Sequence, residues 1–216
     1  ATGILMGLTA TLNPFRFHPS YMEIAELPLD ERVKIMNDSS FRDRLLGEEG
    51  VSINPLVDEI VQSYEKMFKL GEPANYEPDP KDSFQSLSET SNRTAQEIAY
   101  DAMLEKEGRA LIYHPLFNYQ PGDLSLVEKM LKHPYTISGL GDAGAHCGAI
   151  SDASFPTTLV QHWSRDRDRG GERAVGDVAD RQPGSRGCRS PLGLQWRAGH
   201  VPRALAKRQP NHFVQV

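Results

Sequence analysis

Asp142 carries the clearest chemical signal in the sequence. It lies in Gly141-Asp-Ala-Gly144, directly after a short β-prone run at 136–140, and His146 and Cys147 follow within one turn. In a parallel α/β barrel, catalytic groups project from the C-terminal ends of strands. The small neighbours of Asp142 would let a substrate or a metal-bound water approach the carboxylate closely. We therefore predict that Asp142 is catalytic; the alternative is a loop residue that caps the following turn.

Two histidines are candidates for binding a substrate. His146 could line the mouth of a pocket, or it could hydrogen-bond to the loop backbone. His114 ends an apolar strand expected over 110–117, so it should face either a substrate pocket or the core. Cys147 has a single histidine beside it and no second ligand at metal-type spacing, which indicates a small buried side chain.

Periodic apolar residues indicate the elements that must position these groups. A stripe made of Ile60, Val61, Tyr64, Met67 and Phe68 fits helical spacing, which is typical of core packing. In the middle of the chain the order helix–strand–helix–strand predicts a parallel α/β sheet. Ser39 or Ser40 should cap the second expected helix, and Gly47 and Gly108 should end helices. The expected helices are 31–36, 39–47, 91–107 and 123–132, and the expected strands lie within 3–12, 110–117 and 136–140.

Composition excludes several classes of protein. The 216 residues are 38% hydrophobic and 25% charged, which allows one sizeable core or two small ones. A net charge of −5 argues against a general nucleic-acid binder. Two cysteines make no disulfide framework. The apolar opening at 1–12 lacks a basic flank and is too short to span a bilayer, so we expect a cytoplasmic protein without a membrane partner.

The charge is divided unevenly along the chain. Residues 1–170 hold 16 Lys and Arg against 26 Asp and Glu, whereas residues 171–216 hold 8 against 3. The second segment has no Ile, Met or Tyr and is rich in Arg, Gly and Pro. We predict a boundary here, with 171–216 poorly ordered as the product of a reading-frame shift near 172–174. The alternative is a natural Arg-rich tail that binds anions.

Several motifs together resemble one known family. They are Thr11-Leu-Asn-Pro-Phe15, Leu111-Ile-Tyr-His-Pro-Leu-Phe-Asn-Tyr119, Leu140-Gly-Asp-Ala-Gly-Ala-His-Cys-Gly148, Asp152-Ala-Ser-Phe-Pro156 and His162-Trp-Ser-Arg-Asp-Arg167. In this order they resemble the amidohydrolase superfamily, in particular the N-acyl-D-amino-acid deacylase (D-aminoacylase) branch. The resemblance covers about residues 3–170, and its most specific part runs from 140 to 167.

The resemblance implies a fold and a reaction. The fold is a (β/α)8 TIM-like barrel of the metal-dependent hydrolases, of which residues 1–170 would form the C-terminal strands. The reaction is hydrolysis of a linear amide, in which zinc activates water and an N-acyl-D-amino acid yields a D-amino acid and a carboxylate. Asp142 matches the family's proton-transfer carboxylate on the eighth strand, which also makes a weak contact with the metal. Such a carboxylate beside an activated water is a competent proton shuttle.

One departure from the family pattern affects the expected activity. The family's principal metal ligands include a His-x-His motif, and this sequence has none. We therefore expect the chain alone to be inactive and its partner to be the N-terminal half of the barrel. Two alternatives remain. One is a cyclic amidase such as a hydantoinase or dihydroorotase, with a bridging carboxylated Lys. The other is a non-catalytic barrel fragment that binds or self-associates through exposed strand edges.

Overall fold

The computed structural model describes residues 3–119, 122–136 and 162–163. The chain divides into two units. The first comprises Ala1–Asp123 and Gly144–Ser151, and the second comprises Leu124–Ala143 and Asp152–Val216. Asp142, His146, Cys147, the expected strand at 136–140 and the segment 171–216 lie outside the described residues.

Three short strands form the sheet of the first unit. They are β1 (Gly3–Met6), β2 (Phe68–Lys69) and β3 (Ile112–Pro115), and β3 lies in the middle. Both neighbours pair with β3 antiparallel, with Ile4 opposite His114 and Phe68 opposite Tyr113. All four residues of β3 are buried, as the apolar run predicts.

The three described strands pair antiparallel, whereas the parallel pairing predicted between 110–117 and 136–140 stays a prediction, because 137–140 lie outside the described residues. Apolar periodicity identifies a strand but carries no information about the direction of its partner. Here β3 takes its partners from a strand at the start of the described chain and from a two-residue strand that the periodicity assigned to a helix. The three described strands do not close into a barrel.

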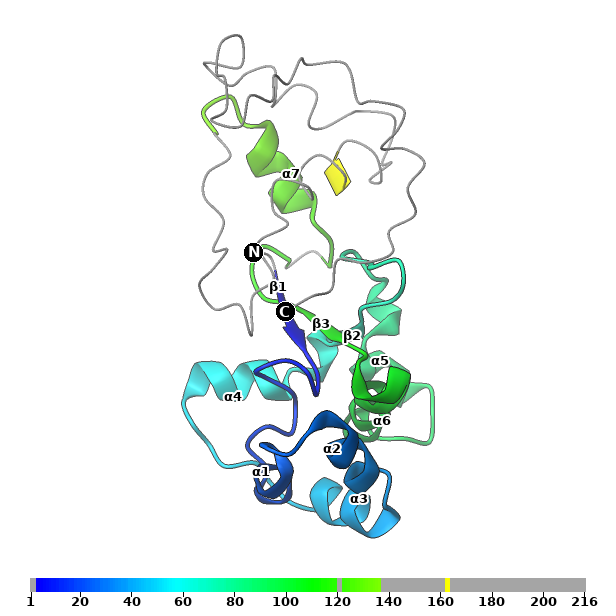
Figure 1. Cartoon of the computed structure of the whole chain (residues 1–216). Helices are drawn as coiled ribbons and strands as arrows, with labels where there is room; N and C mark the ends of the chain where they lie inside the picture. The colour runs from blue at the N-terminus through cyan, green and yellow to red at the C-terminus, as the bar shows by residue number, and fades with distance from the viewer. Residues whose placement is uncertain (1–2, 120–121, 137–161, 164–216) are drawn as a thin grey trace, which may run out of the picture. The chain divides into compact units, whose positions relative to one another are not determined.

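Three helices follow β1 and lie together below the sheet in the view of Figure 1. They are α1 (Pro19–Ile24), α2 (Leu29–Met36) and α3 (Ser39–Leu46). Asp38, rather than a serine, caps α3 by accepting a hydrogen bond from the Phe41 N–H at 3.0 Å. Gly47 ends α3 as predicted.

The apolar stripe predicted as one helix is divided into three elements. The helix α4 (Pro55–Gln62) ends before Ser63, the 3-10 turn η1 (Tyr64–Lys66) follows, and Phe68 enters β2. The Ser63 hydroxyl donates to the carbonyl of Glu59, one turn earlier. Pairing of Phe68 with β3 takes precedence over the helical spacing, because tertiary contacts readily override local propensity.

Two further helices complete the first unit after a 3-10 turn, η2 (Pro80–Asp82). They are α5 (Phe84–Glu89) and α6 (Ala95–Gly108), and α6 packs against α2 and α5. Inside the last turn of α6, Lys106 and Glu107 have left-handed backbone angles. Gly108 has φ +79°, and a Cβ there would come within 2.5 Å of the Val33 side chain. Glycine is therefore required where the chain leaves α6 for β3.

Thr94 begins α6 with a complete capping box. Its hydroxyl accepts from the Glu97 N–H at 3.2 Å, and the Glu97 carboxylate accepts from the Thr94 N–H at 2.7 Å. We expect Thr94→Ala to lower the free energy of unfolding by about 1 kcal/mol, because the Glu97 N–H at the start of the helix loses its acceptor. Thr94→Ser keeps the hydroxyl and should retain most of that stability. Chemical denaturation of both variants tests this, and equal losses would contradict the capping role.

The core of the first unit joins β1, β3 and the helices. Tyr100 on α6 donates its hydroxyl hydrogen to the carbonyl of Met36 at 2.7 Å, which ties α6 to the end of α2. The ring of Phe15 meets that of Tyr100 edge-on, with centroids 5.7 Å apart. The largest fully buried side chains are Met6, Leu8, Phe15, Tyr21, Met36, Leu45, Met67, Phe84, Tyr100, Met103, Ile112 and His114.

The second unit contributes one described helix, α7 (Ser125–Lys132), which matches the prediction over 123–132. Lys132 and Glu128 pair one turn apart on it, with Nζ 2.9 Å from Oε1. Trp163 is buried, and its ring meets that of His162 edge-on.

Candidate functional site

Only one of the three predicted site residues belongs to the described part of the chain. Asp142 and His146 lie outside it, so their catalytic and substrate-binding roles remain predictions. His114 is described, and its side chain is 2% exposed on the central strand β3.

The His114 imidazole is buried on β3 and is neutral at pH 7. Neither ring nitrogen has a hydrogen-bond partner among the described residues. Burial lowers the pKa of His114 to about 4, against a smaller opposing effect of its own backbone. The nearby charge of Lys66 also lowers this pKa, and that of Glu59 raises it. At neutral pH this side chain can therefore offer one N–H donor and one lone pair, but no charge.

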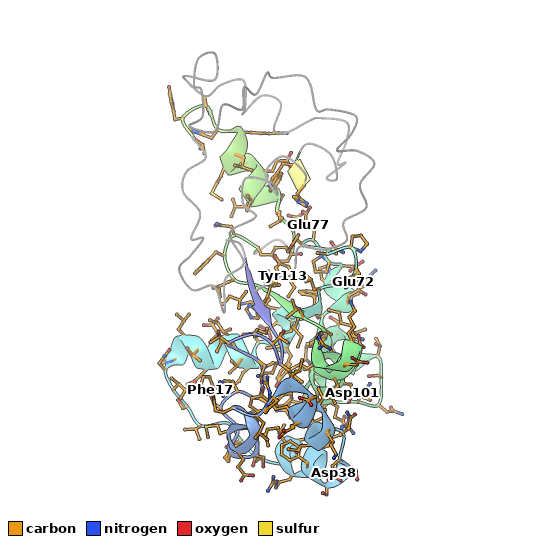
Figure 2. All side chains as sticks on the ribbon, viewed as in Figure 1. Phe17, Asp38, Glu72, Glu77, Asp101 and Tyr113 are labelled. Atoms are coloured by element: carbon orange, nitrogen blue, oxygen red, sulfur yellow. The ribbon has the colours of Figure 1, made fainter. Side chains whose placement is uncertain are left out.

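A polar cavity lies elsewhere in the first unit, beside the start of α1. Its volume is about 510 Å³, within the usual range for small-molecule sites. Phe17, labelled in Figure 2, and Asp58 of α4 both line this cavity. The residues that line the cavity and carry polar groups are His18, Glu48, Glu49, Asp58, Gln62, Tyr64 and Gln96. His114 is not among the lining residues.

Hydrogen bonds fix two of the cavity's carboxylates. Glu48 accepts from the Ser20 N–H at 2.7 Å and from the Ser20 hydroxyl at 3.0 Å, which joins the segment after α3 to the first turn of α1. Asp58 accepts from the Ser52 hydroxyl at 2.6 Å and from the Ile53 N–H at 3.0 Å. The Ser52 bond holds the pKa of Asp58 below its usual value, with help from the backbone N–H. Asp58 is therefore ionised at neutral pH.

His18 adds a buried imidazole to the cavity wall. The side chain is 8% exposed, and its Nδ1 has no partner among the described residues. Burial lowers the pKa of His18, against the opposing effects of the Glu48 carboxylate and the Phe15 carbonyl. The ring packs edge-on against Phe15, with centroids 5.2 Å apart.

The electrostatic character of the cavity is negative. Three carboxylates line it, and its lining residues include no Lys or Arg. A cavity of this sign repels an N-acyl amino acid, which carries a free carboxylate at neutral pH. The cavity is therefore a poor match for the substrate that the sequence resemblance implies.

The zinc that the resemblance implies does not fit the described residues. A catalytic zinc site takes three protein ligands from His, Cys, Asp and Glu. Within residues 3–119, 122–136 and 162–163, no three such side chains come together in a group that could hold a metal ion. His114 is buried with unpartnered nitrogens, yet it has no companion ligands there.

Sequence reasoning missed the cavity because its residues come from distant segments. Glu48 reaches Ser20 across 28 positions, and Tyr64 and Gln96 approach from two further elements. No local motif marks any of these residues. His18 itself precedes Pro19 and Ser20, and this local sequence indicates a loop and not a chemical role.

Comparisons with known proteins found no relative of this chain. No protein-family model, no curated protein and no solved structure matches the chain. Among the described helices, none has both the length and the apolar character needed to cross a bilayer.

Proposed function

We propose that this chain is part of a metal-dependent amidohydrolase that converts N-acyl-D-amino acids to D-amino acids and carboxylates. The observation that carries the proposal is the run from Leu140 to Arg167, which keeps Asp142 in the position of the family's proton-transfer carboxylate. The antiparallel sheet and the acidic cavity lend it no support, because neither bears on that run.

The role of Asp142 follows from the chemistry of amide hydrolysis. A carboxylate takes a proton from the attacking water and returns it to the leaving amine, so that a neutral amine departs. A carboxylate with an ordinary pKa is ionised at neutral pH and can act as the base in the first step. The small residues that flank Asp142 leave room for the amide to approach.

The proposal also predicts that this chain is inactive by itself. A deacylase of this class needs metal ligands, and the described residues supply no such group. We propose that the ligands and the rest of the barrel come from the N-terminal half of the barrel, as part of a longer polypeptide. The metal is proposed to be zinc, as the resemblance implies.

Hydrolysis of N-acetyl-D-methionine, measured together with zinc content, tests the proposal. We expect the longer polypeptide to show activity and to bind zinc. The 216-residue chain should do neither. Asp142→Asn in the longer polypeptide should abolish hydrolysis while zinc is retained, because the amide cannot accept the proton. Asp43→Asn, at an exposed position on α3, is the matched control and should leave the rate unchanged. Absence of hydrolysis in the longer polypeptide, or full activity of Asp142→Asn, would refute the proposal.

A further inference from the structure

The loop 48–54, between α3 and α4, forms one wall of the acidic cavity through Glu48, Glu49, Gly50 and Val51. Hydrogen bonds join both of its ends to the first unit, including those that Asp58 of α4 accepts from Ser52 and Ile53. The Val51 N–H donates to the carbonyl of Phe17 at 2.8 Å, and Glu48 accepts two hydrogen bonds from Ser20. The side chain of Val51 is 50% exposed, so apolar burial contributes little to holding the loop closed.

His18 lies directly beneath this loop. A Cβ placed on Gly50 would be 3.3 Å from both Nδ1 and Cε1 of His18, so the loop backbone covers that edge of the ring. The covered Nδ1 has no partner among the described residues. A protonated imidazole carries an N–H on each nitrogen, and the covered Nδ1–H would then be buried without an acceptor. Protonation is therefore easier when the loop is open and water reaches Nδ1.

Burial under the closed loop disfavours protonation of His18. Charged groups around the ring oppose this effect of burial but do not cancel it. Glu48 and Glu49 face it from the loop, Asp58 lines the cavity from α4, and Tyr64 lines it from η1. The Glu48 carboxylate raises the pKa of His18, and so does the backbone carbonyl of Phe15. Burial has the larger effect, and the pKa of His18 in the closed form is lowered. The closed form thus prefers neutral His18, and the open form accepts the proton.

We propose that loop 48–54 is an acid-released latch: protonation of His18 frees the loop and opens the acidic cavity beside α1. The latch is fully closed above the ordinary pKa of histidine, about 6.5, and closure weakens as the pH falls below that value. This inference goes beyond the proposed hydrolysis and does not depend on it.

Amide hydrogen exchange at Val51 tests the latch, because its N–H forms the backbone bond that holds the loop to Phe17. After correction for intrinsic exchange chemistry, protection at Val51 should fall by up to about tenfold per pH unit below pH 6.5. Ile98 on α6, whose N–H bonds to Thr94, reports opening of the whole unit. Protection at Val51 should be lower than at Ile98 at every pH. Equal protection at the two sites, or no pH dependence at Val51, would overturn the latch.

Two substitutions distinguish the effect of His18 titration from the effect of loop packing at Gly50. His18→Gln has no titrating ring, so the pH dependence at Val51 should disappear. Gly50→Ala crowds the ring edge and should lower protection at Val51 at every pH while leaving the pH dependence intact. If His18→Gln does not fold, an NMR titration of His18 in the unaltered chain decides the matter. A pKa below 6.5 supports the latch, and a pKa of 6.5 or above overturns it.

Discussion

Lowering the pH from 7 to 4 should reduce the free energy of unfolding by about 3 kcal/mol through His114 alone. In the folded protein, burial lowers the pKa of this side chain from 6.5 to about 4. The unfolded chain therefore binds the proton at a higher pH than the folded chain does. The stabilisation is complete above pH 6.5 and is lost progressively as the pH falls to about 4.

Urea denaturation at several pH values, with variants at His114, measures this contribution. His114→Phe removes the titrating ring and should flatten the profile between pH 6.5 and 4. At pH 7 we expect this variant to remain within about 1 kcal/mol of the parent, because neither ring nitrogen has a partner among the described residues. His133→Phe, at an exposed position, should keep the parent's slope. A loss of several kcal/mol for His114→Phe at pH 7 would mean that a ring nitrogen has a bound partner, and would contradict the prediction.

Phe15→Ala should cost about 3–5 kcal/mol of stability, the largest effect we expect from a single substitution in the first unit. The Phe15 side chain is 0% exposed and lies between the rings of His18 and Tyr100. Its removal leaves a cavity and breaks both edge-on aromatic contacts, and such pairs contribute about 0.5–1.5 kcal/mol each. The Tyr100 hydroxyl bond to Met36 limits how far the surrounding helices can collapse into the space.

Phe117→Ala provides the matched control for Phe15→Ala. It deletes the same atoms from a side chain that is 59% exposed, and should change stability by no more than about 0.5 kcal/mol. Equilibrium unfolding in urea compares the two variants directly. Similar losses at the two positions, or a loss under about 1 kcal/mol for Phe15→Ala, would show that Phe15 does not hold the core together.

Local signals in the sequence located helices better than their capping residues. The helix over 39–47 and its end at Gly47 are confirmed, and the helix expected over 91–107 is present from Ala95 to Gly108. Asp38 caps α3 in place of the adjacent serines, because an Asp one residue earlier accepts the same backbone bond equally well. The strand over 110–117 is present as Ile112–Pro115.

Contacts between distant segments account for what the sequence did not predict. Phe68 has helical spacing with Tyr64, yet it lies in β2, because its partner Tyr113 is available only in the folded chain. The sequence did not predict the cavity for the same reason, because the hydrogen bond there between Ser20 and Glu48 joins residues that are far apart in the sequence. For Asp142 and His146 the sequence remains the sole basis, and their assignment rests on the resemblance of the run around them.

The pairing of β1 with β3 affects how the chain folds as it leaves the ribosome. Gly3 lies opposite Pro115, so 112 residues of synthesis separate the two ends of that pair. At translation rates of about 5–20 residues per second, β1 is synthesised on the order of ten seconds before its partner strand. Throughout that interval the apolar segment around Ile4 and Met6 is exposed to chaperones and to neighbouring nascent chains. Expression at a slower translation rate would lengthen this vulnerable period and should lower the soluble yield.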